Sequence, residues 1–211
     1  MRRETNEEKL IRLTEIERGL WAEGHVVAGI DEVGRGPLAG PVVTACVSIP
    51  QNRLVPGVDD SKKLSEKRRE ALYPRLLEAA EYAETCFVWP EEIDDINILN
   101  ATKRAMETCA AGFRGEGALF LIDAVQGLRL PGEARALVHG DALSYMIGAA
   151  SIVAKVARDR YMIEQDALYP MYGFARNKGY GTAEHIAALK AYGPCPLHRR
   201  SFIGGILGDR P

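Results

Sequence analysis

Short runs of apolar and β-branched residues alternate along this chain with longer stretches whose apolar residues repeat at helical spacing. Runs at 26–33, 41–49, 82–89 and 118–123 are short enough to be buried strands, and 135–138 is a weaker fifth candidate. Helical stretches follow the second, third and fourth of these runs. The resulting order of strand, strand, helix, strand, helix, strand, helix is typical of an α/β architecture with a mixed sheet.

The helices are predicted from apolar spacing and from capping residues. From Ser144 onward, apolar residues as far as Ile163 trace one helical face, with Lys155, Arg158 and Asp159 largely on the other side. The expected helices span 5–20, 65–80, 97–111, the segment that begins at Ser144, and 182–192.

Composition excludes several classes of protein. Of the 211 residues, 46% are hydrophobic and 27% charged, which excludes collagen-like and disordered chains and fits a single domain. No apolar run approaches the roughly 18 residues that a membrane helix needs. The first residues contain no apolar signal region, so we expect a cytoplasmic protein. Four scattered cysteines without a C-x-x-C pair indicate reduced thiols that fill the core.

The charge is unevenly distributed along the chain. The net charge is −2 in total, but residues 141–211 have a net charge of +3 and residues 1–140 of −5. An acidic protein is not expected to hold nucleic acid by its overall charge. Any basic binding surface must therefore be local.

Carboxylates occupy positions that are otherwise apolar. Asp31 and Glu32 lie inside the first strand, Asp123 ends the fourth, and Asp141 opens a helix. Buried carboxylates are costly unless they are paired or bind a cation, and oxygen ligands suit Mg²⁺ or Mn²⁺. Ordinary roles remain open: Asp31 could accept from loop N–H groups, Asp123 could shape a turn, and Asp141 could cap its helix.

Asp31 and Glu32 present a geometric difficulty, because consecutive side chains of a regular strand point to opposite faces. We expect the strand to be disrupted at Glu32, which the following Gly34 would permit. The alternative is that Glu32 contributes its backbone carbonyl. A regular strand would remove Glu32 as a side-chain ligand.

Gly34, Arg35 and Gly36 directly follow these carboxylates. Glycines let backbone N–H groups approach a phosphate or a sugar closely, and an arginine adds a charged fork. The segment 34–40 is expected to form a loop or a bulged hairpin between the first two strands.

Basic and aromatic residues offer further candidates for nucleic-acid binding. Basic runs at 62–63, 67–69 and 198–200 are typical of solvated faces, although they could also contact phosphates. Tyr172, Phe174 and Tyr180 are interleaved with basic residues in a glycine-rich stretch, a pattern suited to stacking on bases or sugars. We expect His185 to be a packing or hydrogen-bonding residue.

Taken together, these residues resemble the ribonuclease HII family, the type 2 ribonucleases H, over nearly the whole chain. The leading motif is Ala28-Gly-Ile-Asp-Glu-Val-Gly-Arg-Gly-Pro-Leu-Ala-Gly-Pro-Val-Val43. One variation is Ala124, which follows Asp123 where a glycine is expected. The further matching segments are Asp60-Ser-Lys-Lys-Leu64, Leu121-Ile-Asp123, Gly140-Asp141, Ser151-Ile-Val-Ala-Lys-Val-Ala-Arg-Asp159, Asn177-Lys-Gly-Tyr-Gly-Thr182 and His198-Arg-Arg-Ser-Phe202.

The resemblance implies a ribonuclease H-like fold, a mixed sheet flanked by helices, forming one catalytic domain over residues 1–211. Residues from about 168 would form a small helical extension that contacts the substrate. The residues at catalytic and metal-binding positions of the family are Asp31, Glu32, Asp123 and Asp141. The residues expected to contact the substrate are Gly34, Arg35 and Gly36 at the ribonucleotide, Tyr180 at the RNA-to-DNA junction, and Lys62, Lys155 and Arg158.

The implied reaction is hydrolysis of RNA within RNA–DNA hybrids, and at single ribonucleotides in duplex DNA during replication and repair. Two divalent ions, Mg²⁺ or Mn²⁺, would act during catalysis, and the products would have 5′-phosphate and 3′-hydroxyl ends. We expect a monomer, no membrane contact, and a replication or repair protein of unknown identity as a further partner.

Two alternatives from other classes stay open on the sequence alone. One is a different metal-dependent nuclease, such as a DNA nuclease or a resolvase. The other is a non-catalytic protein that binds hybrids, although four clustered negative charges would gain nothing from phosphates without metal ions. Cleavage of all-DNA, hybrid and single-ribonucleotide duplexes separates these alternatives.

Overall fold

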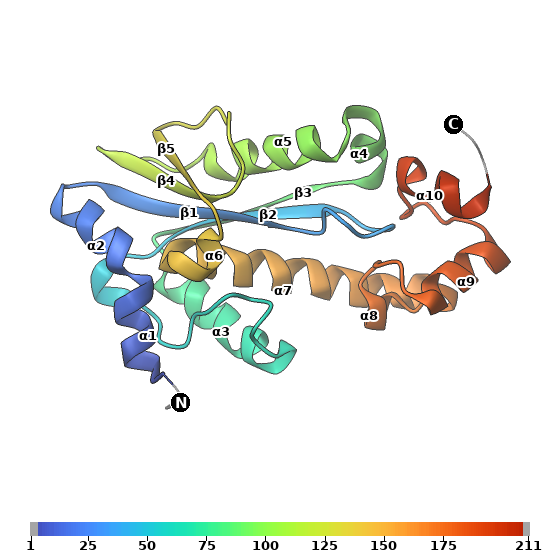
Figure 1. The fold of residues 1–211 in the computed structure, drawn as a ribbon, viewed down its shortest axis with the longest axis horizontal. Helices are drawn as coiled ribbons and strands as arrows, with labels where there is room; N and C mark the ends of the chain where they lie inside the picture. The colour runs from blue at the N-terminus through green and yellow to red at the C-terminus, as the bar shows by residue number, and fades with distance from the viewer. Residues whose placement is uncertain (1–3, 209–211) are drawn as a thin grey trace.

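The computed structural model of the chain describes residues 4–208. Residues 1–3 and 209–211, the ends of the expected domain, lie outside the described residues. The elements are α1 (Asn6–Leu13), α2 (Glu15–Ala22), β1 (Val26–Val33), β2 (Val42–Ser48), η1 (Gln51–Arg53), α3 (Glu66–Ala79), β3 (Tyr82–Val88), α4 (Pro90–Ile96), α5 (Ile98–Ala110), β4 (Ala118–Asp123), β5 (Glu133–Leu137), α6 (Gly140–Leu143), α7 (Tyr145–Leu168), η2 (Pro170–Tyr172), α8 (Phe174–Asn177), α9 (Ala183–Tyr192) and α10 (Arg200–Leu207) (Figure 1).

Five strands form one mixed sheet in the order β3-β2-β1-β4-β5, which confirms the predicted α/β architecture. The strand β1 lies at the centre, antiparallel to β2 and parallel to β4. The connection between β1 and β2 is a hairpin loop that contains the glycine-rich segment. The parallel pairing brings the ends of β1 and β4, with their carboxylates, to the same edge of the sheet.

Helices cover both faces of the sheet, with α5 on one side and α7 and α3 on the other (Figure 1). Strand side chains alternate, so Val27 packs in the core beneath α7 whereas Ala28 and Ile30 pack in the core with α5. The helix α7 lies directly on β1. A Cβ atom at Gly29 would lie 2.1 Å from the backbone of Met146, so only glycine allows this approach.

The C-terminal elements η2 to α10 form a separate layer at one end of the sheet (Figure 1). Its small core includes Met162, Tyr172, Phe174 and Leu197. The ring of Phe202, on α10, packs against the cluster formed by β2, β3, α4 and α5. The apolar C-terminal segment therefore packs against the parent domain.

Several boundaries differ from the sequence prediction. The first helix is divided at Thr14, whose hydroxyl donates to the carbonyl of Leu10 and which caps α1. Three short helices, α4, α8 and α10, were not predicted individually. On α7, Arg158 and Asp159 are buried whereas Ile163 is exposed, so the predicted face is wrong in the second half. The reason is that the C-terminal layer covers the side on which Arg158 lies.

Two further expectations concern the core and membranes. All four cysteines are free, and three of them are buried, which confirms their role in packing. Within residues 4–208, no helix is long and apolar enough to span a bilayer.

Candidate active site

The four predicted carboxylates come from three elements. Asp31 and Glu32 lie near the end of β1, Asp123 is the last residue of β4, and Asp141 lies in the first turn of α6. The N–H group of Gly140 donates to Oδ1 of Asp123 at 2.8 Å. This hydrogen bond ties α6 to the end of β4 and brings Asp141 to the same edge of the sheet.

The charges of these side chains act on one another. Burial raises the pKa of Asp31 well above its ordinary value, and the charges of Glu32 and Asp123 raise it further. Burial also raises the pKa of Glu32 and of Asp123, and their nearest carboxylates add to both shifts. Asp141 contributes to the shift at Asp123. The four carboxylates therefore lie within electrostatic reach of one another, a pattern that is frequent at functional sites.

The strand is not disrupted at Glu32, so that prediction was wrong. The pairing of β1 with β2 continues regularly through Glu32 opposite Thr44 and Val33 opposite Val43. The two side chains therefore leave opposite faces of the sheet. Asp31 lies toward α7, where a hydrogen bond from Ser151 stabilises its charged form. A regular strand at this point argues against the Glu32 carboxylate as a ligand on the Asp31 side.

The carboxylate of Glu32 still belongs to the electrostatics of the site. Its Oε1 lies 3.5 Å from Nη1 of Arg35, while its Oε2 is buried with no hydrogen-bond partner. A buried carboxylate oxygen without a partner is unfavourable. A hydrogen-bond donor or a cation on that face of the sheet would satisfy this oxygen.

Two of the four residues accept backbone hydrogen bonds, but from a strand and a helix rather than from a loop or turn beside them. Oδ1 of Asp31 accepts from the N–H group of Glu32 at 2.8 Å, and Asp123 holds Gly140 as described. Asp141 does not cap α6, because His139 occupies the cap position and no side chain caps that helix. After Asp123, Ala124 has a φ of 52°, a left-handed conformation that favours glycine. This explains why a glycine is expected there.

The residues fit a divalent cation by their chemistry and charge. Their ligand atoms are hard oxygens, which suit Mg²⁺ and Mn²⁺, and burial leaves their negative charges poorly solvated. Among the described residues, no group of three or more Asp, Glu, His or Cys side chains is already arranged around one metal position. Instead, Nζ of Lys62 lies 3.2 Å from Oδ2 of Asp141 and supplies positive charge there.

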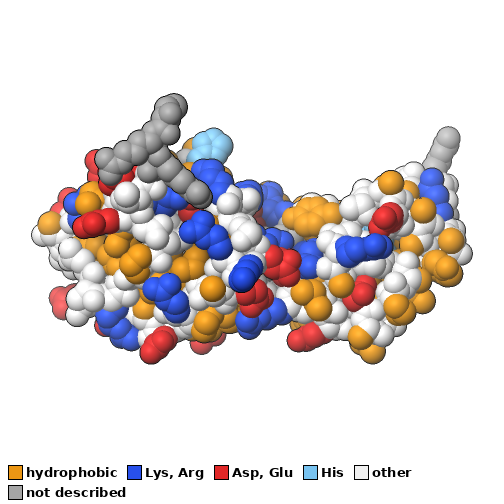
Figure 2. Space-filling model, turned by 90° about the horizontal axis from the view of Figure 1, so that it is seen from below, with side chains coloured by type: hydrophobic (Ala, Val, Ile, Leu, Met, Phe, Trp, Pro, Cys, Tyr) orange, Lys and Arg blue, Asp and Glu red, His pale blue; other side chains and the backbone are white. Residues whose placement is uncertain are grey.

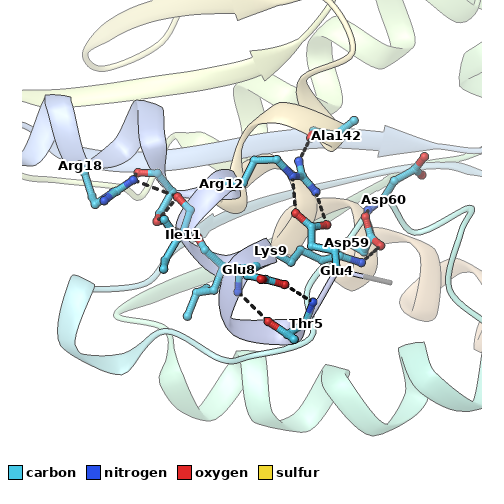
Figure 3. A network of polar contacts seen from close by, with 12 residues as sticks. Glu4, Thr5, Glu8, Lys9, Ile11, Arg12, Arg18, Asp59, Asp60 and Ala142 are labelled. Atoms are coloured by element: carbon cyan, nitrogen blue, oxygen red, sulfur yellow. Dashed lines mark hydrogen bonds and ion pairs between the residues drawn. The ribbon is translucent and has the colours of Figure 1, made fainter. Parts of the chain in front are cut away.

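Helices α1 and α2 support the segment that holds Asp141 (Figure 3). Arg12 donates to the carbonyl of Ala142, the residue after Asp141, and Lys9 pairs with Asp59. On α2, the buried Oε1 of Glu17 accepts from the Ser144 hydroxyl at 2.6 Å and from the Met146 N–H at 3.0 Å. Glu17 follows Leu13 by four residues on the predicted apolar face, so its spacing could have identified it as buried.

Two buried arginines hold the glycine-rich loop by its carbonyl groups. Arg199 donates to the carbonyls of Gly34, Arg35 and Gly40. Arg158 donates to those of Ala39, Pro41 and Lys178. Both side chains are 0% exposed. Sequence reasoning treated 198–200 as a solvated basic run, because a buried arginine and an exposed one have the same local pattern.

The predicted substrate contacts differ in accessibility. Arg158 was predicted to touch the substrate, but its burial and its three carbonyl partners make it part of the scaffold. Lys62 is 81% exposed at the carboxylates, and Lys155 is half-buried, with Nζ 2.6 Å from Asp159. Tyr180 is 43% exposed, with the guanidinium of Arg158 6.0 Å from its ring centroid.

The face seen from below carries a local concentration of positive charge. Figure 2 shows Lys and Arg side chains gathered across its middle, between the main body and the C-terminal layer. Asp and Glu side chains lie among them on the same face.

His185 is buried and hydrogen-bonded, which confirms its predicted role. Its Nε2 lies 3.0 Å from Nε2 of His198, and its Nδ1 lies 2.9 Å from the carbonyl oxygen of Tyr180.

Sequence comparisons place this arrangement among known proteins. A model of the family described as Ribonuclease HII matches residues 28–204. A ribonuclease HII of Desulfitobacterium hafniense (strain DSM 10664 / DCB-2) is 49% identical over 198 residues, which cover 92% of this chain and 75% of the relative. One from Caldicellulosiruptor bescii is 45% identical over 194 residues, which cover 92% and 94%.

Solved structures share the fold. The ribonuclease H2 from Pyrococcus horikoshii OT3 aligns with a TM-score of 0.72 and 27% identity, covering 86% of this chain and 97% of that one. The structure of the PCNA:RNase HII complex from Archaeoglobus fulgidus contains a chain that aligns with a TM-score of 0.71 and 25% identity, covering 83% and 93%.

Proposed function

Because the chain belongs to the ribonuclease HII family and is a ribonuclease H enzyme, we propose that it also cleaves at single ribonucleotides embedded in duplex DNA. Such cleavage would serve ribonucleotide removal in replication and repair, and would leave 5′-phosphate and 3′-hydroxyl ends. The observation that supports this most is the position of the carboxylates. They lie beside a loop whose carbonyls are fixed by Arg199, with the exposed ring of Tyr180 next to it.

Ribonucleases H of this family depend on divalent metal ions. We propose that Asp31, Asp123 and Asp141 hold two such ions, Mg²⁺ or Mn²⁺, by their carboxylates, with Glu32 contributing its backbone carbonyl. When bound, these ions would activate a water molecule and neutralise the charge that develops on the leaving 3′ oxygen. The raised pKa values of Asp31 and Asp123 support this proposal.

The other residues at the site would orient the substrate. Gly34, Arg35 and Gly36 would present backbone N–H groups and a guanidinium to the ribonucleotide. Its 2′-hydroxyl is the group that distinguishes RNA from DNA at a single position. Tyr180 would stack on the deoxyribose side of the junction. Lys62 would shift from Asp141 to a substrate phosphate when cations bind, and Lys155 would remain paired with Asp159 at the margin.

The remaining expectations also stand as proposals. The whole chain would work as one domain and as a monomer in the cytoplasm, with residues from about 168 as its substrate-contacting extension. The Archaeoglobus relative was solved in a complex with PCNA. A replication or repair protein is accordingly the class of protein partner that we propose here.

Cleavage-site mapping on a duplex with one embedded ribonucleotide tests the proposed function. In Mg²⁺ or Mn²⁺ we expect a single cut beside that ribonucleotide, with no cut in the same duplex made entirely of DNA. Cleavage of the all-DNA duplex would indicate a DNA nuclease instead. Tight binding of the hybrid without turnover in either metal would indicate a non-catalytic binding protein.

A further inference from the structure

The loop at 34–40 and the segment at 178–181 pack directly against each other. The N–H group of Leu38 donates to the carbonyl of Gly179 at 2.9 Å. A Cβ atom at Gly179 would lie 2.3 Å from the carbonyl oxygen of Ala39. This contact sets the distance between the two elements proposed to read the ribonucleotide and its deoxyribose neighbour.

Two buried histidines, His185 and His198, connect the segment at 178–181 to the C-terminal layer. The N–H group of Cys195 donates to Nδ1 of His198 at 3.0 Å, so that nitrogen is the acceptor and Nε2 of His198 bears the proton. Nε2 of His198 then donates to Nε2 of His185 at 3.0 Å. Nδ1 of His185 in turn donates to the carbonyl of Tyr180 at 2.9 Å.

Both histidines are neutral in this arrangement. Burial lowers the pKa of His185, and burial together with the neighbouring His185 lowers that of His198 to about 4. The rings pack edge to face with Tyr172 and Phe174, which fixes their orientation. Each nitrogen of the two histidines therefore has one defined role as donor or acceptor.

Arg199, the residue after His198, binds the loop at 34–40. Arg199 donates to the carbonyls of Gly34, Arg35 and Gly40, and its own N–H group donates to the carbonyl of Leu38 at 2.9 Å. The two consecutive buried residues thus contact different elements. Arg199 binds the carbonyls of the glycine-rich loop, and His198 reaches the backbone of Tyr180 through His185. Neither side chain is exposed to a substrate.

We propose that His198 and Arg199 form a positioning unit that fixes Tyr180 relative to the glycine-rich loop, and that this unit sets the preference for a ribonucleotide followed by a deoxyribonucleotide. The proposal rests on the proposed function. His185 and His198 are positioning residues, since they act through the backbone of Tyr180. Arg199 acts in the same way through the loop carbonyls.

Two conservative substitutions interrupt the unit at different points. His198→Asn keeps an acceptor near the N–H group of Cys195 but removes the donor to His185. His185→Gln keeps an acceptor for His198 but removes the donor to Tyr180. The control is Tyr172→Phe, which deletes a hydroxyl that donates to Gly193 at 2.6 Å but keeps the ring that packs on His198.

The measurement is the ratio of kcat/KM on a single-ribonucleotide duplex to kcat/KM on a uniform hybrid, together with the Tm of each variant. We expect His198→Asn and His185→Gln to lower this ratio about tenfold or more, as misplacement of a recognition group does. Tyr172→Phe should lower Tm and leave the ratio unchanged. If one variant does not fold, the other still tests the proposal.

A double-mutant cycle with Tyr180→Ala separates positioning from general destabilisation. In that background, His185→Gln should leave the ratio unchanged, because the aromatic ring that it positions through the Tyr180 backbone has been removed. A ratio that stays within about twofold of wild type in both single variants, or that falls equally in the Tyr180→Ala background, would overturn the inference. Absence of any single-ribonucleotide cleavage by the wild type would overturn the proposed function instead.

Discussion

On one side of the site, Asp31 is buried with Glu32 and Asp123 half-buried near it, and the charges of Glu32 and Asp123 raise the pKa of Asp31. On the other side, Arg158 and Arg199 are buried at least as deeply, yet each donates to three backbone carbonyls. Buried charge is tolerated when hydrogen bonds compensate it and is costly when they do not. The compensated side therefore builds the structure, and the uncompensated side is where we propose that a cation binds.

The strongest test removes one charge from the uncompensated side. Asp31→Asn or Asp123→Asn should lower cleavage by several orders of magnitude, because a cation ligand is lost while the side-chain shape is kept. Without divalent ions, the Tm should be unchanged or higher, since one of several repelling carboxylates has become neutral. Initial cleavage rates in Mg²⁺ and thermal unfolding in EDTA measure the two effects.

A second readout does not depend on turnover. Addition of Mn²⁺ should raise the Tm of the wild type, because a ligand that binds only the folded state stabilises it. The rise should be smaller in Asp123→Asn. Near-normal cleavage by either variant in Mg²⁺ would remove these carboxylates from the mechanism.

The converse test removes a compensated charge. Arg158→Met should lower the free energy of unfolding by about 3–5 kcal/mol, because the carbonyls of Ala39, Pro41 and Lys178 lose their donors within the protein. The midpoint of urea unfolding measures this loss. The matched control is Arg176→Met, whose ion pair with Glu184 is largely exposed and should contribute less than about 1 kcal/mol. Similar losses in both variants would contradict the comparison.

The lowered pKa of the buried His198 predicts that the stability of the protein depends on pH. Burial lowers the pKa of His198 to about 4 from an ordinary 6.5, and the nearby His185 and Arg200 contribute. Between these values the unfolded chain binds a proton that the folded chain does not, so stability falls as the pH drops from about 6.5 to about 4. The effect of this residue is on the order of 2–3 kcal/mol.

His198→Asn isolates that contribution. Comparing chemical denaturation of the variant and the wild type from pH 7 to pH 4 cancels the titration of the carboxylates. The difference in stability between the two proteins should shrink as the pH falls. A difference that is independent of pH would mean that folding does not lower the pKa of His198.

Local patterns were sufficient for the central sheet and for most helices. The strand β4 has the predicted bounds, and the predicted capping residues Ser65 and Thr182 each accept from the N–H group three residues later. These features depend on spacing and on short-range hydrogen bonds. The same reasoning placed the carboxylates at strand ends, and the parallel pairing of β1 and β4 then brings them together.

What the sequence could not supply depends on contacts between distant residues. Arg199 reaches Gly34 across 165 positions, and Glu17 reaches Ser144 across 127. No local pattern distinguishes a buried arginine with carbonyl partners from a solvated one. The expected break at Glu32 was wrong for a related reason, since pairing with β2 keeps the strand regular.

Lys62 is an exposed cation paired with a buried carboxylate, so it belongs to neither group of buried charges. Its substitution should have the smallest effect on stability. Its amine is 3.2 Å from Asp141 but is 81% exposed, so Lys62→Met should change the free energy of unfolding by less than about 1 kcal/mol. If the amine moves to a phosphate when substrate binds, KM should rise several-fold with kcat nearly unchanged. The slope of log affinity against log salt should also decrease by about 1.

The neighbouring Lys63 provides the matched control, because its amine faces Asp60 at 3.6 Å and its removal changes the net charge equally. Lys63→Met should leave the salt slope close to that of the wild type. Equal changes in both variants would mean that only overall charge matters. A large fall in kcat for Lys62→Met would instead place this lysine with the carboxylates, as a compensating charge that the reaction itself requires.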